Sequence, residues 1–276
     1  MKNKTIGFIG AGNMARSLAG GLLANGWDRS QILLADPDAG QRQTMKELLG
    51  LAAYADNGAV AGRADVLVLA IKPQFLKTVA TQLAPMVQEK QPLVISIAAG
   101  IRATDLQRWL GGKQAIVRAM PNTAALIGSG ATGMIANDRV DASGRDEAES
   151  ILRSVGVAVW VKNEDQLDVV TALSGSGPAY FFLLMEALEQ AAIEHGLGRE
   201  TARLLTLETA FGAAKMALEG GEEPAQLRRR VTSPGGTTER AITVLEDAGI
   251  HAAIRRAVAA AVERSRELAD MFGGEQ

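Results

Sequence analysis

The 276-residue sequence contains no cysteine. This absence excludes disulfide bonds, zinc sites built on thiolates and cysteine nucleophiles. It also fits a protein that works in a reducing interior, and we therefore predict a cytoplasmic location. Hydrophobic residues make up 47% of the chain, enough for a large core, and the length predicts two domains.

The sequence also lacks a large net charge of either sign and a long apolar run. The net charge is -2, and the densest basic cluster, Arg228–Arg230, is interpreted as the solvated end of a helix. These features argue against a nucleic-acid partner. No apolar run approaches the length of a membrane span, and the N-terminal segment is typical of a core strand rather than a signal peptide. We therefore predict no membrane association.

Histidine is scarce. His195 and His251 are the only two, and they are predicted at a helix end and a helix start, where capping or surface roles are more common than general-base catalysis. The sequence has no His-Glu-x-x-His motif, no paired histidines and no cluster of carboxylates, so it predicts no metal site. The chain therefore offers little acid–base machinery.

The N-terminal segment carries the most informative motif. An apolar run, Thr5–Ile9, leads into Gly10-Ala11-Gly12-Asn13-Met14-Ala15, which opens a helix-like stretch. This is the G-x-G-x-x-A pattern of a dinucleotide-binding unit. The first glycine allows the tight turn, the second lets the pyrophosphate approach the backbone, and the alanine lets the helix pack on the strand. The N–H groups and the dipole at the helix start then favour phosphate.

Further apolar runs alternate with helix-like stretches through the first half. The predicted strands are Ile32–Ala35, Val66–Ala70, Leu93–Ile97, Ala115–Val117 and Val157–Val161. Strands that are apolar on both faces and alternate with helices predict an α/β fold, a Rossmann-type doubly wound parallel sheet. Two of the predicted helices are Gln41–Leu49 and Thr104–Leu110, the second opened by a capping box of Thr104 and Gln107.

The loop after the second strand bears on the choice of cofactor. Asp36 follows Gly12 by 24 residues, near the spacing at which an acid binds the ribose 2′-hydroxyl. An acid there favours NAD(H) over NADP(H), because it would repel a 2′-phosphate. The alternative is that Asp36-Pro37-Asp38 only builds a turn.

The loops after the other strands supply further cofactor candidates, because the carboxyl ends of parallel strands share one edge of a sheet. Asn57 has the chemistry for a ribose or adenine contact, although it could equally cap the next helix. Small residues would admit a flat ring, and Lys72 could reach a phosphate or ribose. The remaining candidates are Ala70, Ile71, Pro73, Ala98, Ala99 and, near the nicotinamide end, the stretch Arg118–Thr123.

The pattern changes after residue 162, where strand signals give way to helices. We predict a dinucleotide-binding domain over residues 1–162 and an all-α domain over residues 163–276. The expected helices are Ala179–His195, Glu200–Glu219, Thr237–Ala248 and His251–Phe272. Their apolar residues occupy more than one face, which predicts packing across a subunit interface.

Two stretches interrupt this helical pattern, Ser174–Tyr180 and Thr232–Thr238. The second joins two helices, so its backbone N–H groups and hydroxyls converge at a helix start. That arrangement suits a small anion such as a carboxylate. An ordinary capped connection is the alternative, although it explains the density of hydroxyls less well.

The scarcity of acid–base residues favours one class of substrate. A protonated imine already carries an electrophilic carbon, so an enzyme mainly has to orient it against a nicotinamide. A simple carbonyl would need a Lys or His donor. The residues therefore favour an imine-reducing dehydrogenase.

The chain closely resembles the Δ1-pyrroline-5-carboxylate reductases. The resemblance spans nearly the whole chain and rests on Gly7–Ala15, Ile71–Pro73, Val94–Gly100, Arg118–Thr123, Ser174–Tyr180, Gly212–Met216 and Ser233–Thr238. It implies NAD(P)H-dependent reduction of 1-pyrroline-5-carboxylate to L-proline, the last step of proline biosynthesis. It further implies a Rossmann domain followed by a helical dimerisation domain, and dimers that assemble further.

Site roles follow from the same resemblance. Gly10–Ala15 would hold the pyrophosphate, Asn57 and Ala70–Pro73 would line the rest of the cofactor, and Ala98 and Ala99 would lie beside the nicotinamide. The backbone of Gly235, Gly236, Thr237 and Thr238 would hold the substrate carboxylate, and the Thr238 hydroxyl would bond the ring nitrogen. The active site would form between subunits of a homo-oligomer.

Two departures from the family pattern stand out. Ala124 replaces the usual proline after Met-Pro-Asn-Thr, which alters a turn and not the chemistry. Asp36 and Asp38 stand where many members that prefer NADPH have small, hydroxyl-bearing or basic residues, although Arg42 could still reach a 2′-phosphate. The rival functions are a β-hydroxyacid dehydrogenase, which would need a lysine on the helix after Gly177, and a non-catalytic NAD-binding regulatory protein.

Overall fold

The computed structural model describes residues 4–274 and divides the chain into two compact units. Of these residues, 4–176 and 260–274 form the first unit, and Gly177–Ala259 is the second. We describe each unit by itself.

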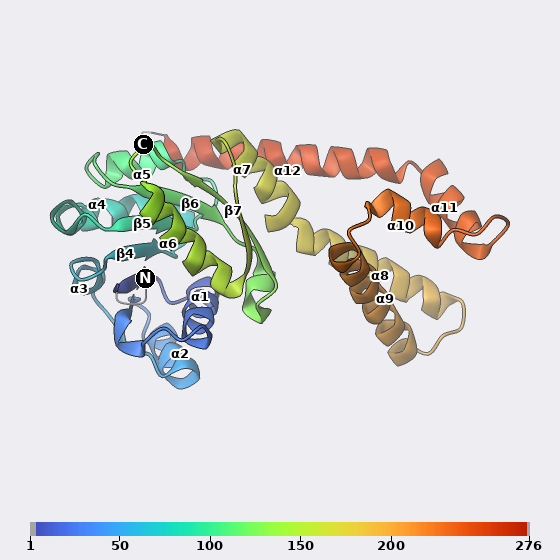
Figure 1. Cartoon of the computed structure of the whole chain (residues 1–276), viewed down its shortest axis with the longest axis horizontal. Coiled ribbons are helices and arrows are strands. Elements are labelled where there is room, and N and C mark those ends of the chain that lie inside the picture. Colours follow the sequence, from blue (N-terminus) through green and yellow to red (C-terminus); the bar gives the residue numbers. More distant parts are fainter. Residues whose placement is uncertain (1–3, 275–276) are drawn as a thin grey trace. The chain divides into compact units, whose positions relative to one another are not determined.

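The first unit is built on one twisted sheet (Figure 1). In the described residues the strand order is β3-β2-β1-β4-β5-β6-β7-β8. All neighbours pair in parallel except β6 and β7, which are antiparallel. The strands are β1 (Ile6–Ile9), β2 (Ile32–Ala35), β3 (Ala53–Tyr54), β4 (Val66–Leu69), β5 (Leu93–Ser96), β6 (Ile116–Met120), β7 (Gly130–Ala136) and β8 (Gly156–Trp160).

Helices cover both faces of this sheet, which explains why the central strands are apolar throughout. One face packs against α1 (Asn13–Ala24), α2 (Ala39–Leu49) and α6 (Ala142–Leu152). The other packs against α3 (Asn57–Ala61), α4 (Pro73–Lys90) and α5 (Ala103–Trp109). Short 3-10 turns lie at Arg29–Gln31, Thr123–Ile127 and Arg153–Val155. The predicted doubly wound α/β sheet is confirmed.

Strand β7 was not predicted, because Gly130 and Gly133 weaken its strand signal. The structure explains the second glycine. A Cβ at Gly133 would lie 2.6 Å from Cγ1 of Val170, so the missing side chain lets helix α7 (Glu164–Val170) approach the sheet. Long-range packing therefore determines this residue, and local propensity does not reveal it.

The capping box predicted at Thr104 and Gln107 is wrong. Helix α5 begins at Ala103, with Arg102 as its N-cap residue and no side-chain cap from that position. The N–H of Ala103 instead donates to Oε1 of Glu164 at 3.1 Å, across 61 residues of sequence. Distant side chains can satisfy helix N–H groups in this way, which a sequence pattern cannot reveal.

The first unit extends beyond residue 162, the predicted end of the dinucleotide-binding domain. Helix α7 (Glu164–Val170) packs on β7, and the end of α12 (Ile250–Gly273) also belongs to this unit. The hydroxyl of Ser265 on α12 donates to Oδ1 of Asp168 on α7 at 2.6 Å. The chain therefore returns to the sheet after the helical region.

The second unit is helical. It contains α8 (Gly177–Glu194), α9 (Arg199–Glu219), α10 (Pro224–Arg230), α11 (Thr237–Asp247) and the start of α12. The end of helix α10 was predicted, because Arg228–Arg230 was interpreted as the solvated end of a helix. Its start was not predicted; a capping box of Glu223 and Gln226 opens it. Large apolar side chains stay exposed in this unit, among them Phe181, Phe182, Leu183, Leu204, Phe211 and Leu218.

The prediction that the Ser174–Tyr180 stretch interrupts the helical pattern is wrong. Thr171–Gly175 forms a π-helical turn that runs directly into α8, so Glu164–Glu194 is one continuous helical stretch. By length and composition alone this stretch could cross a membrane. The prediction that no apolar run approaches a span is therefore wrong, although apolar helices of soluble proteins pass the same test.

Candidate functional site

A cleft of about 590 Å³ lies where the carboxyl ends of β1, β2 and β4 meet. Parallel α/β sheets bind their ligands at this edge. The lining residues are Gly10, Gly12, Asp36, Pro37, Asp38, Gln41, Asn57, Ala70, Ile71, Lys72, Phe75, Thr78 and Val79. The structure thus brings together most of the predicted cofactor residues that follow the first four strands.

Gly10 is required by the fold itself. Its φ angle is +97°, and its N–H donates to the carbonyl oxygen of Ala35 at 2.7 Å. An added Cβ would lie 2.4 Å from the carbonyl oxygen of Ala70. Glycine therefore allows the turn to pass between the ends of β2 and β4.

Gly12 has no such requirement. Its φ is -72°, and a Cβ there would meet no atom within 4 Å. The space in front of it is the cleft. Within residues 4–274, the N–H groups from Gly12 to Ala15 have no acceptor, as expected for the first turn of a helix. An open glycine beside free N–H groups fits a phosphate group.

The other residues of the glycine turn support it through packing and hydrogen bonds within the protein. Ala11 and Ala15 are buried in the core, and Met14 packs against it. Asn13 opens α1, and its Oδ1 accepts from Nη2 of Arg16 at 2.9 Å. The N–H groups of Gly10 and Ala11 are bonded within the protein, so the donors available to a ligand begin at Gly12.

Asp36 builds the turn and also lines the cleft. Its Oδ2 accepts from the N–H of Ala11 at 2.8 Å, and its Oδ1 accepts from the N–H of Asp38 at 2.9 Å. Asp38 in turn caps α2. Arg42 lies outside the lining, and its Nη1 donates to the carbonyl oxygens of Asp36 and Pro37. Asp36 thus fixes the shape of the glycine turn while placing negative charge in the cleft.

Asn57 is not a helix cap, the alternative left open by its sequence position. Asp56 caps α3 and accepts from the N–H of Gly58 at 2.9 Å. In the described part of the chain, Oδ1 of Asn57 is buried without a hydrogen-bond partner. Buried polar atoms rarely stay unpaired, so a donor from a ligand in the cleft would complete this site.

Lys72 and Pro73 open α4, with Lys72 as the N-cap and Pro73 at the first helical position. Sequence reasoning missed the next turn of this helix, where Phe75, Thr78 and Val79 line the cleft. The signal was present, because a proline a few residues after a strand end favours a helix start.

Ala98 and Ala99 follow β5 and lie outside the lining of the cleft. Nearby, Arg118 of β6 is buried and paired with Glu164 of α7. Burial lowers the pKa of the Arg118 guanidinium below its ordinary value, and the carboxylate of Glu164 opposes that shift.

Asn122 ties the end of β6 to the π-helical turn. Its Nδ2 donates to the carbonyl oxygen of Ser174 at 2.9 Å, and its Oδ1 accepts from the N–H of Ala131 at 3.1 Å. The stretch Arg118–Thr123 and the hydroxyl-bearing stretch at Ser174 therefore meet within the first unit.

The Gly235–Thr238 loop belongs to the second unit. Gly235 has a φ of +70°, and its N–H donates to Oε2 of Glu239 at 2.7 Å. The N–H of Gly236 donates to the carbonyl oxygen of Ser233 at 3.0 Å. Helix α11 begins at Thr237, and the N–H groups of Thr237 and Thr238 have no acceptor in residues 4–274. Two of the four predicted anion donors are thus open, and two are bonded internally.

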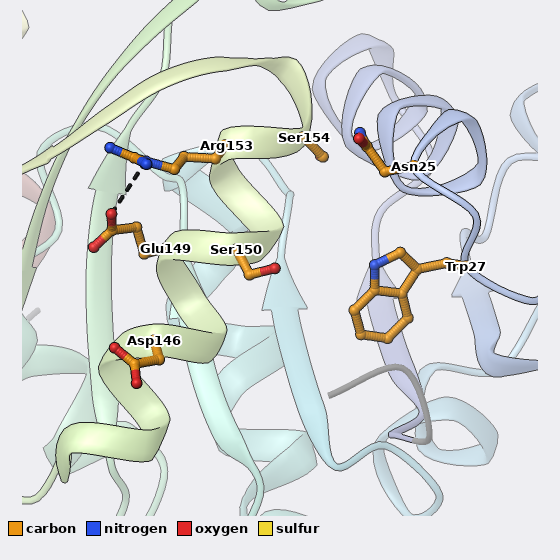
Figure 2. Close-up of a pocket in the computed structure, with 7 residues that line it drawn as sticks. All are labelled: Asn25, Trp27, Asp146, Glu149, Ser150, Arg153 and Ser154. Atoms are coloured by element: carbon orange, nitrogen blue, oxygen red, sulfur yellow. Dashed lines mark ion pairs between the residues drawn. The ribbon is translucent and has the colours of Figure 1, made fainter.

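A second cavity of about 510 Å³ contains none of the predicted residues. Figure 2 shows Asn25 and Trp27 facing Asp146, Glu149, Ser150, Arg153 and Ser154. The carboxylate of Glu149 in this cavity has partners within the protein. It pairs with Arg153 at 3.1 Å and accepts from Nε1 of Trp160 at 2.8 Å. The cavity lies beyond the C-terminal end of α1, whereas Gly12 lies at its start.

The sheet order and the cleft define a dinucleotide-binding protein of the Rossmann class. A family described as NADP oxidoreductase, coenzyme F420-dependent, matches residues 5–100. A family described as pyrroline-5-carboxylate reductase dimerisation matches residues 164–268, from just beyond the predicted boundary at residue 162.

Full-length relatives identify the family. The pyrroline-5-carboxylate reductase of Pseudomonas aeruginosa is 50% identical over 99% of this chain and 100% of its own length. A solved reductase from Coxiella burnetii has a TM-score of 0.92 at 48% identity, covering 96% of this chain and 98% of its own. A Plasmodium falciparum structure described with NADP bound has a TM-score of 0.86 at 31% identity, covering 98% and 99%. The chain belongs to the pyrroline-5-carboxylate reductase family.

The two glycines of the turn give a test of the cleft. We expect Gly12→Ala to raise the dissociation constant for NADH about tenfold, equivalent to ~1.4 kcal/mol, because the methyl group enters the space left for phosphate. The free energy of unfolding should change by less than about 1 kcal/mol. Isothermal titration calorimetry and urea denaturation measure the two quantities.

Gly10→Ala is the matched comparison. Its Cβ would meet the Ala70 carbonyl at a positive φ, so we expect a loss of about 2–4 kcal/mol in the free energy of unfolding. If Gly12→Ala binds NADH as tightly as the parent, the phosphate does not lie at Gly12.

Proposed function

We propose that this protein reduces 1-pyrroline-5-carboxylate to L-proline with NADPH or NADH. The observation that carries the proposal is the row of free N–H groups from Gly12 to Ala15, beside the unpaired Oδ1 of Asn57, in a member of this reductase family. A second helix start, at Thr237, supports the proposal, because the N–H groups of Thr237 and Thr238 have no acceptor in residues 4–274.

The cofactor would lie along the carboxyl edge of the sheet. Gly12–Ala15 would hold the pyrophosphate, Asp36 and Asn57 the ribose, and Lys72 a phosphate or ribose oxygen. Ala98 and Ala99 would flank the nicotinamide, which supplies the hydride for the imine carbon when bound.

The substrate would be held by the start of α11. The free N–H groups of Thr237 and Thr238 and the dipole of the helix suit its carboxylate. We infer that Glu239 releases the N–H of Gly235 when the substrate carboxylate takes its place. The hydroxyl of Thr238 would then orient the ring nitrogen, so that little further acid–base chemistry is required.

We further propose that two copies of the chain form the active site together. The second unit leaves large apolar side chains exposed on α8 and α9, more than a stable monomer normally leaves in contact with water. The matched dimerisation family covers these helices. A symmetric dimer would bury them and would let the Gly235–Thr238 loop serve the cofactor cleft of the partner subunit. A cytoplasmic location stays a prediction.

The decisive measurement is turnover of 1-pyrroline-5-carboxylate with each cofactor in parallel. We expect oxidation of both NADH and NADPH at 340 nm, with NADH used at least as well because of Asp36. Absence of turnover with both cofactors contradicts the proposed function.

Asp36→Asn extends this test. Its one amide oxygen can still accept from the N–H of Ala11. The N–H of Asp38 then loses its acceptor, and the negative charge is lost. We expect the ratio of kcat/KM for NADPH over NADH to rise about tenfold, as Coulomb repulsion of a phosphate at short range implies. Asp28→Asn, a capping acid outside the cleft, is the control and should leave the ratio unchanged.

Thr238→Ala tests the substrate site. Loss of a hydrogen bond to a charged group costs about 1.5–3 kcal/mol, so kcat/KM for the substrate should fall roughly 10- to 100-fold. The dissociation constant for NADH should not change. Thr243→Ala, on the same helix, is the control, because that hydroxyl bonds only the carbonyl of Glu239. Unchanged kinetics in Thr238→Ala remove this residue from the site.

Phe211→Glu tests the dimer. Phe211 is 64% exposed on α9, and Leu48 is 63% exposed on α2 of the first unit. If α9 lies in the interface, Phe211→Glu should raise the dimer dissociation constant by 100-fold or more, since interface anchors contribute about 2–4 kcal/mol or more. Leu48→Glu should leave the dimer intact. Analytical ultracentrifugation measures both, and an unaffected Phe211→Glu dimer excludes this face.

A further inference from the structure

A buried ion pair lies beside the loop predicted to flank the nicotinamide. Arg118 comes from β6, where it pairs in register with Ser96 of β5, and Glu164 opens α7. Nη1 of Arg118 donates to Oε2 of Glu164. The side chain of Arg118 is almost completely buried, and that of Glu164 is partly exposed. Removing one member of such a pair leaves an uncompensated charge in the protein.

Glu164 has a second partner. Its Oε1 accepts from the N–H of Ala103, the first residue of α5, at 3.1 Å. Ala103 is the point where the loop after β5 ends and the helix begins, and Ala98 and Ala99 are the start of the same loop. One carboxylate therefore joins the adjacent strand to the far end of this loop.

The end of α12 backs the same loop from another side. Gly100 has a φ of +69°, and a Cβ there would lie 3.0 Å from Cβ of Leu268 and 3.4 Å from the ring of Phe272. Nη2 of Arg102 pairs with Oδ1 of Asp270 at 2.9 Å. The loop is thus fixed at Gly100, at Arg102 and, through Glu164, at Ala103.

We propose that Glu164 is a positioning residue for the reductase reaction, which links β6 to the start of α5 and so fixes the loop of Ala98 and Ala99 against the nicotinamide. The inference rests on the proposed function and on the predicted place of these two alanines. A displacement of about 1 Å in a reacting group can cost roughly 100-fold in rate, so a loosened loop should lower kcat more than it weakens binding.

The chain contains a matched control pair. Nζ of Lys4 lies 2.8 Å from Oε2 of Glu147, a buried carboxylate on α6. Lys4 precedes β1, so this pair lies at the amino ends of the strands, opposite the cofactor edge. Glu147→Gln removes the carboxylate charge from an ion pair with one buried and one partly exposed member, as Glu164→Gln does, without touching the loop after β5.

The experiment compares the parent, Glu164→Gln and Glu147→Gln. We expect both variants to lose stability in urea denaturation. Only Glu164→Gln should lower kcat, about tenfold or more, with KM for substrate and cofactor within about twofold of the parent. The fluorescence lifetime of bound NADH, which reports the surroundings of the nicotinamide without turnover, should change in Glu164→Gln alone.

Ala103→Pro tests the same link without altering the ion pair. Proline is favoured at the first helical position, and Arg102 has φ -76° and ψ 153°, the conformation that a residue before proline prefers. This variant should keep α5 and lose only the backbone N–H of residue 103, which donates to Glu164. We expect the same fall in kcat and the same change in NADH lifetime as in Glu164→Gln, and it replaces that variant if the latter does not fold.

The proposal is overturned if kcat and the NADH lifetime of Glu164→Gln or Ala103→Pro stay within twofold of the parent. It is also overturned if Glu147→Gln changes kcat and the NADH lifetime as much as Glu164→Gln does. If the parent itself does not reduce 1-pyrroline-5-carboxylate, the proposed function fails instead. The NADH lifetimes then decide alone: a change confined to Glu164→Gln and Ala103→Pro supports the positioning role, and no change refutes it.

Discussion

The close approach of three strand ends at Gly10 is the constraint on which the cofactor half of this protein depends. The N–H of Gly10 bonds the end of β2, and its α-carbon leaves no room for a side chain beside the carbonyl of Ala70 at the end of β4. Asp36 holds the next N–H, at Ala11. The turn is therefore held by bonds within the protein, and the first turn of α1 follows it at the cleft.

Fold and ligand make separate demands on this turn. Packing requires glycine at Gly10, whereas nothing in the protein requires it at Gly12. Asp36 has two roles. Its carboxylate holds the turn through the N–H of Ala11, and it also places negative charge in the cleft. A change of cofactor preference at this position would therefore also disturb the turn, and this restricts which residues can replace Asp36.

The loop after β5 depends on distant parts of the chain. It contains no capping side chain of its own, and Glu164 and the end of α12 supply what it lacks. The last helix consequently belongs in part to the sheet unit. Residues from the helical half of the sequence thus take part in shaping the cofactor half.

The sequence by itself determined the doubly wound sheet, the position of the glycine turn and the late helix start at Thr237, because these depend on local periodicity and on glycine at fixed offsets. It did not reveal β7, whose Gly133 makes sense only beside Val170, nor the cap that Glu164 provides for α5. Only the tertiary structure decided these features. Contacts between residues far apart in the chain leave no periodic signal in the sequence.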